Sequence, residues 1–458
     1  MASIEFPQGP KNCQHLDLCF EPSPHAEEAG YCRPTAQQRA TAVGKAKNGA
    51  AGVSDSTFPA PLLLPGDDLS WDPRYPPQSL RSWVRGKHRN EVTNTRNAIY
   101  VAGQPDTAAD VGFVCGWENP ITDRVDTSVN AATPPSHNDV AKYVRAFYHG
   151  MQFRILPAET FLLTSWEDER PKSKRKAKSA NPGLIGLATS IEKIGIRTRP
   201  CPNETFLQQL NLNDLLDAAI SALPDDAYAL LMIVNHDLYE DEDDDFCCGR
   251  AYGGSRVAVV STARYNPVLD EEQNVEREHA WPASHCKPYM WECCGAGSGP
   301  MRSAGNKGRK PKSGMGLDDN SSSPSPLQAA VSTSRELLSS SAGQQKEPAW
   351  LSKLWLSRVC QTASHELGHC FGIAHCVYYA CVMQGTASLA EDVRQPPYLC
   401  PVDLAKLLRA TEANEKERYE AVLGFCEEWQ ETRMFAALGA WVGRRIGELG
   451  QGESSKEN

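Results

Sequence analysis

The chain has 458 residues, of which 40% are hydrophobic and 23% charged, and its formal net charge is −10. That length suffices for one large domain or two to three ordinary ones. The acidic balance argues against nucleic acid as the main partner, because neutralising phosphates requires a basic surface. The longest apolar runs have strand length, and none approaches the roughly 18 residues of a membrane span.

The amino-terminal text, MASIEFPQGP, lacks the cationic start and apolar run of a secretory signal. We therefore expect an intracellular, cytoplasmic monomer without a membrane partner. The basic run at 172–178, KSKRKAK, fits either a solvated loop or a nuclear import signal. In a reducing compartment the 16 cysteines are thiols or metal ligands. Scattered ones such as Cys13, Cys115 and Cys201 fit ordinary thiols, whereas the dense group at 360–400 needs another explanation.

Composition divides the chain into four regions. Residues 1–56 are rich in Gly, Ala, Pro and polar types, which predicts disorder. Residues 57–139 mix apolar and turn-forming residues, as expected of an ordered extension that packs on another part of the protein. Residues 140–440 alternate helical and strand patterns and form the main domain. Residues 441–458 predict a polar tail.

The main domain predicts an α+β fold, with a mixed twisted sheet over helices. The unbroken apolar run at 227–234 is typical of a strand covered on both faces. Charged and Gly/Ser-rich stretches near 167–182 and 295–347 predict disordered insertions. Periodicity predicts helices at 140–149, 181–193, 210–223, 348–371, from 401 and at 414–438, and further strands at 151–156, 194–199 and 256–263.

The most informative text is HELGHCFGIAH, which runs from His365 to His375. On a helix, His365 and His369 lie one turn apart on the same face and can bind one metal ion. Gly372 tolerates the positive φ of a sharp turn that would bring His375 back as a third ligand. Three imidazoles leave a fourth coordination position open, which is typical of a catalytic rather than a structural zinc site.

Glu366 is expected to face that open position. Zinc lowers the pKa of a bound water to roughly 7, and Glu366 would take its proton as the water attacks a peptide carbonyl. The spacing HExxHxxGxxH is typical of metzincins, so the residues predict a zinc-dependent peptidase that acts on peptides or proteins. One alternative is a non-catalytic zinc protein that binds peptides in the same cleft. A second is a zinc-stabilised scaffold, which would need a closed shell around the metal.

The sequence after the third histidine indicates which branch of the metzincins the chain resembles. HCVYYACVMQG, followed by CPVD at 400–403, resembles the archaemetzincin family, a branch of the metzincins. Stretches at 79–103, 235–240 and 261–267 resemble the same family, so that the likeness covers residues 57–430 without the insertions. The resemblance implies a metzincin-like zinc peptidase fold for residues 140–440.

The resemblance also implies residue roles. His365, His369 and His375 would bind the catalytic zinc, and Met383 would form a Met-turn beneath it, although a methionine here also fits a core filler. A second, structural zinc would be bound by Cys376, Cys381 and Cys400. The strand at 256–263 would contain the sheet edge along which a peptide lies.

The sequence departs from the family pattern at Asp403, where a fourth cysteine is expected. Zinc accepts a carboxylate oxygen at ~2.0–2.2 Å, so a site of three cysteines and Asp403 is possible chemically. Alternatively, Asp403 only stabilises the first turn of the following helix. Cys370 or Cys426 could supply a fourth thiolate instead.

Two further groups could bind metal. His279 and His285 stand close to Cys293 and Cys294, beside a predicted insertion. The acidic run EDEDDD at 240–245 could attract calcium or basic peptides, but it lacks the spacing of a calcium loop and fits a solvated turn better.

Overall fold

The computed structural model describes residues 13–44, 54–87, 89–121, 132–166, 183–295, 323–341 and 343–454. A five-stranded sheet has the strand order β10-β11-β8-β1-β3. Its neighbours are parallel except β10, which pairs antiparallel with β11 and forms one edge. The strands are β1 (Ala98–Ala102), β3 (Gln152–Ile155), β8 (Ala227–Val234), β10 (Gly249–Tyr252) and β11 (Val257–Ser261).

This sheet is buried on both faces, because its central strands are apolar at consecutive positions. In β8, Leu231 and Ile233 join one hydrophobic core, whereas Leu230 and Met232 join the other. The strand predicted at 227–234 is thus confirmed as covered on both sides. The helices of the first core include α5 (His137–Phe147), α9 (Pro348–Cys370), α11 (Pro401–Thr411), α12 (Glu415–Glu428) and α13 (Arg433–Ser454), and α6 (Leu212–Ser221) belongs to the second.

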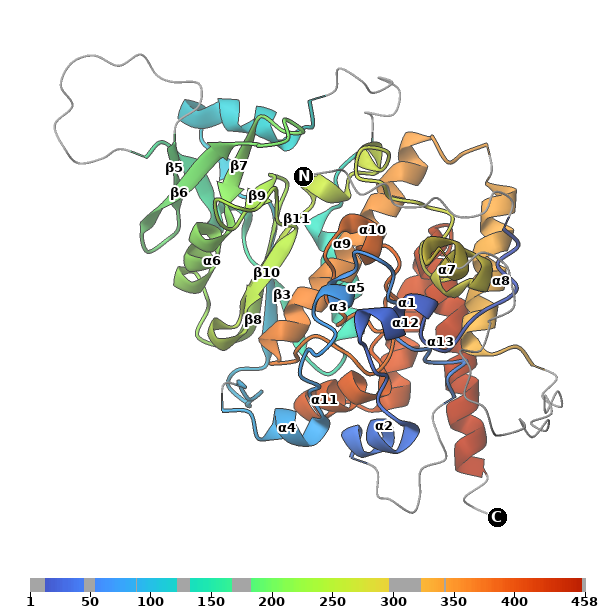
Figure 1. Ribbon diagram of the computed structural model, residues 1–458. Helices are drawn as coiled ribbons and strands as arrows, with labels where there is room; N and C mark the ends of the chain where they lie inside the picture. The colour runs from blue at the N-terminus through green and yellow to red at the C-terminus, as the bar shows by residue number, and fades with distance from the viewer. Residues whose placement is uncertain are drawn as a thin grey trace, which may run out of the picture.

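A second, six-stranded sheet has the order β2-β4-β5-β6-β7-β9. Figure 1 shows β5, β6, β7 and β9 on the opposite side of the molecule from α8, α12 and α13. The two sheets and the helices make a mixed α/β architecture. The strands are β2 (Asp106–Thr107), β4 (Leu162–Thr164), β5 (Leu184–Ala188), β6 (Lys193–Pro200), β7 (Gln208–Asn211) and β9 (Leu238–Tyr239).

The helix predicted at 181–193 is wrong, because this segment forms β5 and the turn of a hairpin. β5 pairs antiparallel with β6, with Gly186 opposite Gly195. The hydroxyl of Thr189 accepts hydrogen bonds from the backbone N–H groups of Ile191 and Glu192, which closes the turn. Glycine is unfavourable inside a helix, and β5 buries its apolar side chains against the second core.

No helix of the described residues is long and apolar enough to cross a membrane, including the seven that remain to be given. They are α1 (Pro24–Ala29), α2 (Ala36–Ala42), α3 (Asp68–Trp71), α4 (Leu80–Val84), α7 (Lys287–Cys293), α8 (Pro326–Ser340) and α10 (Leu389–Asp392). The 3₁₀ segments are η1 (Ala109–Glu118), η3 (Ala158–Thr160), η4 (Gly253–Ser255), η5 (Ala263–Tyr265), η6 (Pro267–Leu269) and η7 (Ala283–His285).

Ordered helices lie in the amino-terminal stretch that was expected to be disordered. Residues 13–44 contain α1 and α2, and α2 begins with a capping box between Thr35 and Gln38. The hydroxyl of Tyr31 donates a hydrogen bond to the carbonyl of Val377 at 2.8 Å. Low hydrophobicity misled the prediction, because this stretch is stabilised by contacts with residues more than 300 positions away.

Two other expectations, a disordered insertion at 295–347 and a polar tail from 441, also need correction. Of the insertion at 295–347, residues 326–340 form α8, which begins with a capping box between Ser325 and Gln328 and packs on α13. The tail from 441 continues α13, and Trp441 is buried with its ring stacked on Tyr398 at 4.3 Å. The basic run at 172–178 lies outside the described residues.

Candidate metal centres

The first centre is built where α9 ends. His365 and His369 lie one turn apart on this helix, and their Nε2 atoms are 3.0 Å apart. Gly372, with φ of 71°, reverses the chain just after the helix, as its lack of a side chain allows. His375 returns to the other two, with ring centroids 5.4 Å and 5.1 Å from those of His365 and His369. One ligand atom from each histidine lies within 4.8 Å of the others.

Backbone carbonyls fix the orientation of two of these rings. The Nδ1 atom of His365 lies 2.7 Å from the carbonyl of Val382, and that of His369 lies 2.8 Å from the carbonyl of Ile373. Because a carbonyl can only accept, each Nδ1 carries the hydrogen and each Nε2 presents a lone pair. Burial and the other two imidazoles hold the pKa of His365 well below its usual range, which keeps the ring neutral.

The residues present therefore fit a metal cation. Two lone pairs 3.0 Å apart repel one another unless a cation lies between them. Tetrahedral zinc with bonds of ~2.0–2.1 Å places two nitrogens roughly 3.3 Å apart, close to the observed separation. Burial also lowers the pKa of His369 to about 4, so neutral ligand nitrogens are available at neutral pH.

The third histidine has neighbours that sequence reasoning missed. Its ring lies 5.6 Å from that of Tyr75, and the carboxylate of Asp68 opposes the effect of burial, which lowers the pKa of His375. A Cβ atom on Gly385 would lie 2.3 Å from Asp68 Oδ2 and 2.7 Å from His375 Nδ1. Glycine thus allows this close approach. No local pattern marks Asp68 or Tyr75, because both come from the amino-terminal extension.

Glu366 is buried beside the histidine cluster, with 8% of its surface exposed. Burial raises the pKa of its carboxyl group to about 8, and the guanidinium of Arg250 opposes that rise. Arg250 belongs to β10, which is the edge of the five-stranded sheet. The expectation that the strand at 256–263 is the edge is therefore wrong, because β11 is paired on both sides.

Met383 lies directly beneath the helix that carries the first two histidines. It is fully buried, and a Cβ atom on Gly368 would lie 2.4 Å from its sulfur. Its carbonyl accepts a hydrogen bond from the backbone N–H of Cys376 at 2.7 Å. The thioether is thus held against α9 between the positions of His365 and His369.

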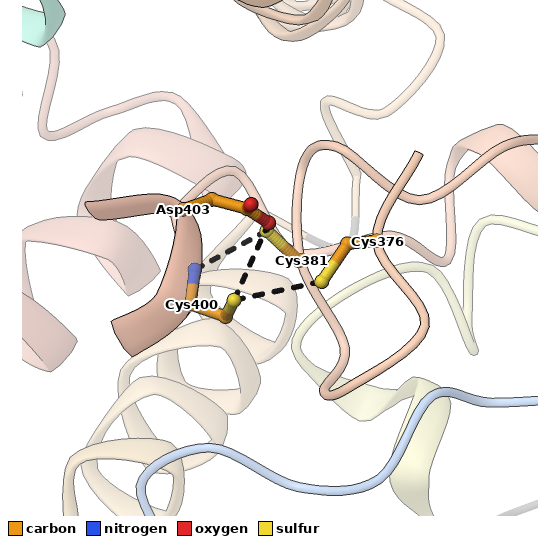
Figure 2. A group of neighbouring side chains, drawn as sticks. All are labelled: Cys376, Cys381, Cys400 and Asp403. Atoms are coloured by element: carbon orange, nitrogen blue, oxygen red, sulfur yellow. Dashed lines mark hydrogen bonds between the residues drawn. The ribbon is translucent and has the colours of Figure 1, made fainter. Parts of the chain in front are cut away.

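The second centre is the buried group in Figure 2, formed by Cys376, Cys381, Cys400 and Asp403. The sulfurs of Cys376 and Cys400 are 3.5 Å apart, and Oδ2 of Asp403 lies 3.3 Å from Cys381 Sγ and 3.4 Å from Cys400 Sγ. Asp403 is therefore part of the group, and its role is not limited to stabilising the first turn of α11. Neither Cys370 nor Cys426 belongs to it.

A buried lysine and a partly buried glutamine connect the two centres. The ammonium group of Lys406 donates to Oδ1 of Asp403 at 2.7 Å and to Oε1 of Gln78 at 2.8 Å. Gln78 in turn donates to the carbonyl of Gly372 at 3.0 Å and accepts from the N–H of Ala374 at 3.1 Å. The turn that positions the third histidine is thus tied to the cysteine group.

The two other predicted metal sites are not formed as the sequence suggested. His285 donates to the carbonyl of Ala60 at 3.0 Å, so it does not join His279. The acidic run at 240–245 forms a turn in which Asp244 accepts backbone hydrogen bonds, and it contributes to none of the metal-ligating groups of the described residues.

Known proteins that resemble parts of this chain include archaemetzincins. The model of peptidase family M54 matches residues 346–409. Archaemetzincin-2 of Macaca fascicularis is 41% identical over 78 residues, which are 17% of this chain and 22% of that protein. Archaemetzincin-1 of Mus musculus is 26% identical over 261 residues, 57% of this chain and 41% of its own length. The chain thus matches about a fifth of the length of the first of these relatives.

The crystal structure of an archaemetzincin from Methanopyrus kandleri is 15% identical, and the match covers 70% of this chain and 98% of that one with a TM-score of 0.30.

Proposed function

We propose that the chain is a zinc-dependent metallopeptidase of the archaemetzincin family that hydrolyses peptide bonds, because its segment at 346–409 matches the model of peptidase family M54. The observation that carries the proposal is the convergence of His365, His369 and His375 beside the buried carboxyl group of Glu366. A metzincin-like catalytic domain at 140–440 is part of the proposal.

The three histidines would hold the catalytic zinc through nitrogens that the backbone already orients. When bound, zinc supplies a Lewis acid that polarises a peptide carbonyl and makes a water molecule more acidic. The hydrogen bonds to Val382 and Ile373 limit rotation of two of the rings, so little ordering remains to be done on binding.

Glu366 would move the proton. Its carboxylate would accept a proton from the attacking water and then deliver it to the leaving amine. Its burial supports this role, because a carboxyl group with a raised pKa both takes up and gives back a proton near neutral pH. The positive charge of Arg250 partly offsets the rise in the pKa of Glu366.

An extended peptide would bind along β10. This strand ends the five-stranded sheet, so its outer N–H and C=O groups can pair with a further strand. Gly253, which directly follows β10, lies so close to α9 that a Cβ atom on it would be 2.4 Å from the carbonyl oxygen of His369. Pairing there would bring a peptide carbonyl toward the three histidines.

A second zinc ion would be structural, with Cys376, Cys381, Cys400 and Asp403 as its ligands. All four are buried, and Lys406 binds the oxygen of Asp403 that faces away from the sulfurs. Four protein ligands leave no position for a substrate.

The test is the Glu366→Gln variant of the full chain, compared with Glu347→Gln at the exposed start of α9. Digestion of a peptide library, followed by mass spectrometry, should show cleavage by the wild type and by Glu347→Gln. Loss of the proton acceptor should lower the rate ~10²–10⁴-fold, with zinc content unchanged. Chelation should stop cleavage and added zinc should restore it.

Two results would contradict the proposal. Unchanged cleavage by Glu366→Gln would exclude this residue as the base. Peptide binding without cleavage by the zinc-loaded wild type would favour the non-catalytic alternative.

A further inference from the structure

A third group of metal-ligating side chains lies outside both centres. Cys13, His15 and His279 each offer a ligand atom within 4.8 Å of the other two. The sulfur of Cys286 lies 3.0 Å from that of Cys13 but outside this group. Cysteine and histidine are the ligands that zinc takes in structural sites. From this geometry we propose that the chain binds a further Zn²⁺ through Cys13, His15 and His279.

The two histidines have buried nitrogens that lack a partner. His279 is fully buried and His15 is 5% exposed. Among the described residues, Nε2 of each has no hydrogen-bond partner, and Glu278 is too distant from His15 at 3.8 Å. Buried ring nitrogens normally have a partner. A metal ion in the middle of this group provides one for both.

His279 is oriented as a ligand. Its Nδ1 lies 2.7 Å from Oε1 of Glu276, which can only accept while ionised, so the ring hydrogen is on Nδ1 and the lone pair is on Nε2. A carboxylate behind a histidine in this way is the usual support of a metal-binding imidazole. The ring also stacks on Tyr289, with centroids 4.1 Å apart, which fixes its plane.

The amino-terminal segment reaches this site through strand-like contacts. Leu18 forms an isolated antiparallel bridge with Cys286. The N–H of Cys19 donates to the carbonyl of His285 at 2.9 Å, and that of Lys287 donates to the carbonyl of Asp17 at 2.8 Å. These bonds deliver Cys13 and His15 to residues more than 260 positions later. The ion would therefore fasten the amino-terminal segment to the main domain.

The site also has a route of entry. Cys13 and His15 line a cavity of about 1030 Å³. A metal ion can therefore reach the ligands without unfolding of the chain. The cavity holds neither of the other two centres, so loading of this site is separable from theirs.

Metal content tests the proposal directly. The full chain, purified in reducing buffer with zinc and then freed of loosely bound metal, is compared with its His279→Gln and Cys13→Ser variants by elemental analysis. Each variant should hold one zinc fewer per chain than the wild type. Cys19→Ser is the matched control, since its thiol lies on the same segment outside the group. This difference is independent of peptidase activity and of how many other zinc ions bind.

A second measurement uses only the wild type. Zinc should protect Cys13 from iodoacetamide until a chelator is added, whereas the exposed Cys32 should react in both conditions. Equal zinc content in wild type and a folded His279→Gln variant would overturn the proposal. If that variant does not fold, reactivity of Cys13 that is unchanged by the chelator would overturn it. A Cys13–Cys286 disulfide in the reduced, zinc-loaded protein would do the same.

Discussion

Gln78 accepts a hydrogen bond at 2.8 Å from the buried ammonium group of Lys406. The same amide holds both ends of the Gly372–Ala374 turn, just before the third histidine of the first centre. Gln78 comes from the amino-terminal extension, and Lys406 from the helix that begins at the second centre. A change in one centre is therefore expected to reach the other through this amide.

Replacing Gln78 by Leu should weaken the first centre. The turn would lose two hydrogen bonds, and His375 would be less well positioned. Residues that orient metal ligands typically contribute 10–100-fold in affinity, so the zinc affinity of the first centre should fall by about that factor. Competition with a chromophoric chelator measures it. Gln37→Leu, on the exposed surface of α2, is the control. Equal zinc affinities in the two variants would show that Gln78 does not help to position His375.

The Asp403–Lys406 pair predicts a strong coupling between two substitutions. Each side chain is 1% exposed, and the two are 2.7 Å apart. Lys406→Met should destabilise the protein by about 3–5 kcal/mol, because it leaves a buried charge unpaired. The double variant Asp403→Cys with Lys406→Met, which has four thiols and no unpaired cation, should recover most of that loss. Urea unfolding of both single variants and the double variant measures the coupling, and additive effects would exclude it.

Two helical glycines should respond in opposite directions. Gly368→Ala introduces a methyl group 2.4 Å from the sulfur of Met383, so we expect a loss of about 1–3 kcal/mol despite the better helix propensity of alanine. Gly424→Ala in α12 meets nothing within 4 Å and should gain about 0.5–1 kcal/mol. Thermal unfolding compares them. A stabilised Gly368→Ala variant would show that Met383 does not support the helix.

How much of these centres could be predicted depends on sequence distance. The spacing of His365, His369 and Gly372 predicts their placement, because a helix and a glycine turn are local structures. Asp68 and Gln78 could not be found, since their partners are about 300 residues away and no periodicity links them. Cys13 was interpreted as an ordinary thiol for the same reason.

The edge strand shows a different failure. Apolar content at 256–263 predicts a strand, and β11 is one. Whether a strand lies at the edge of a sheet depends on which other strands pair with it. Here β10 pairs antiparallel with β11, so β11 is not an edge strand. Only the three-dimensional arrangement shows that β10 rather than β11 forms the edge of the sheet.

Protonation of His236 should lower the free energy of unfolding as the pH falls. This ring is fully buried and bonded to Gln104 and to the carbonyl of Val114, and burial lowers its pKa to about 4. In the unfolded chain its pKa is about 6.5. The unfolded state therefore binds the proton more tightly. The contribution of His236 is complete above about pH 6.5 and falls by about 3 kcal/mol as the pH drops to about 4.

The variant His236→Gln tests this contribution. Its stability at pH 7 should be lower, because the hydrogen bonds change, but the slope of unfolding free energy against pH between 6.5 and 4 should be shallower than in the wild type. Urea titrations across that interval measure both slopes. Parallel slopes would mean that other groups cause the acid sensitivity.

The residues before 90 have a consequence for anyone who shortens this protein. Trp83 donates from its indole to the carbonyl of Phe371, and the N–H of Ala380 donates to the carbonyl of Pro59. A fragment that begins near residue 140 keeps every histidine and cysteine of the first two centres. It lacks the amino-terminal residues that pack against the loop after α9, which carries His375, Cys376 and Cys381. Such a fragment should express as a misassembled or aggregating product, so an inactive truncation would say nothing about the chemistry of the intact protein.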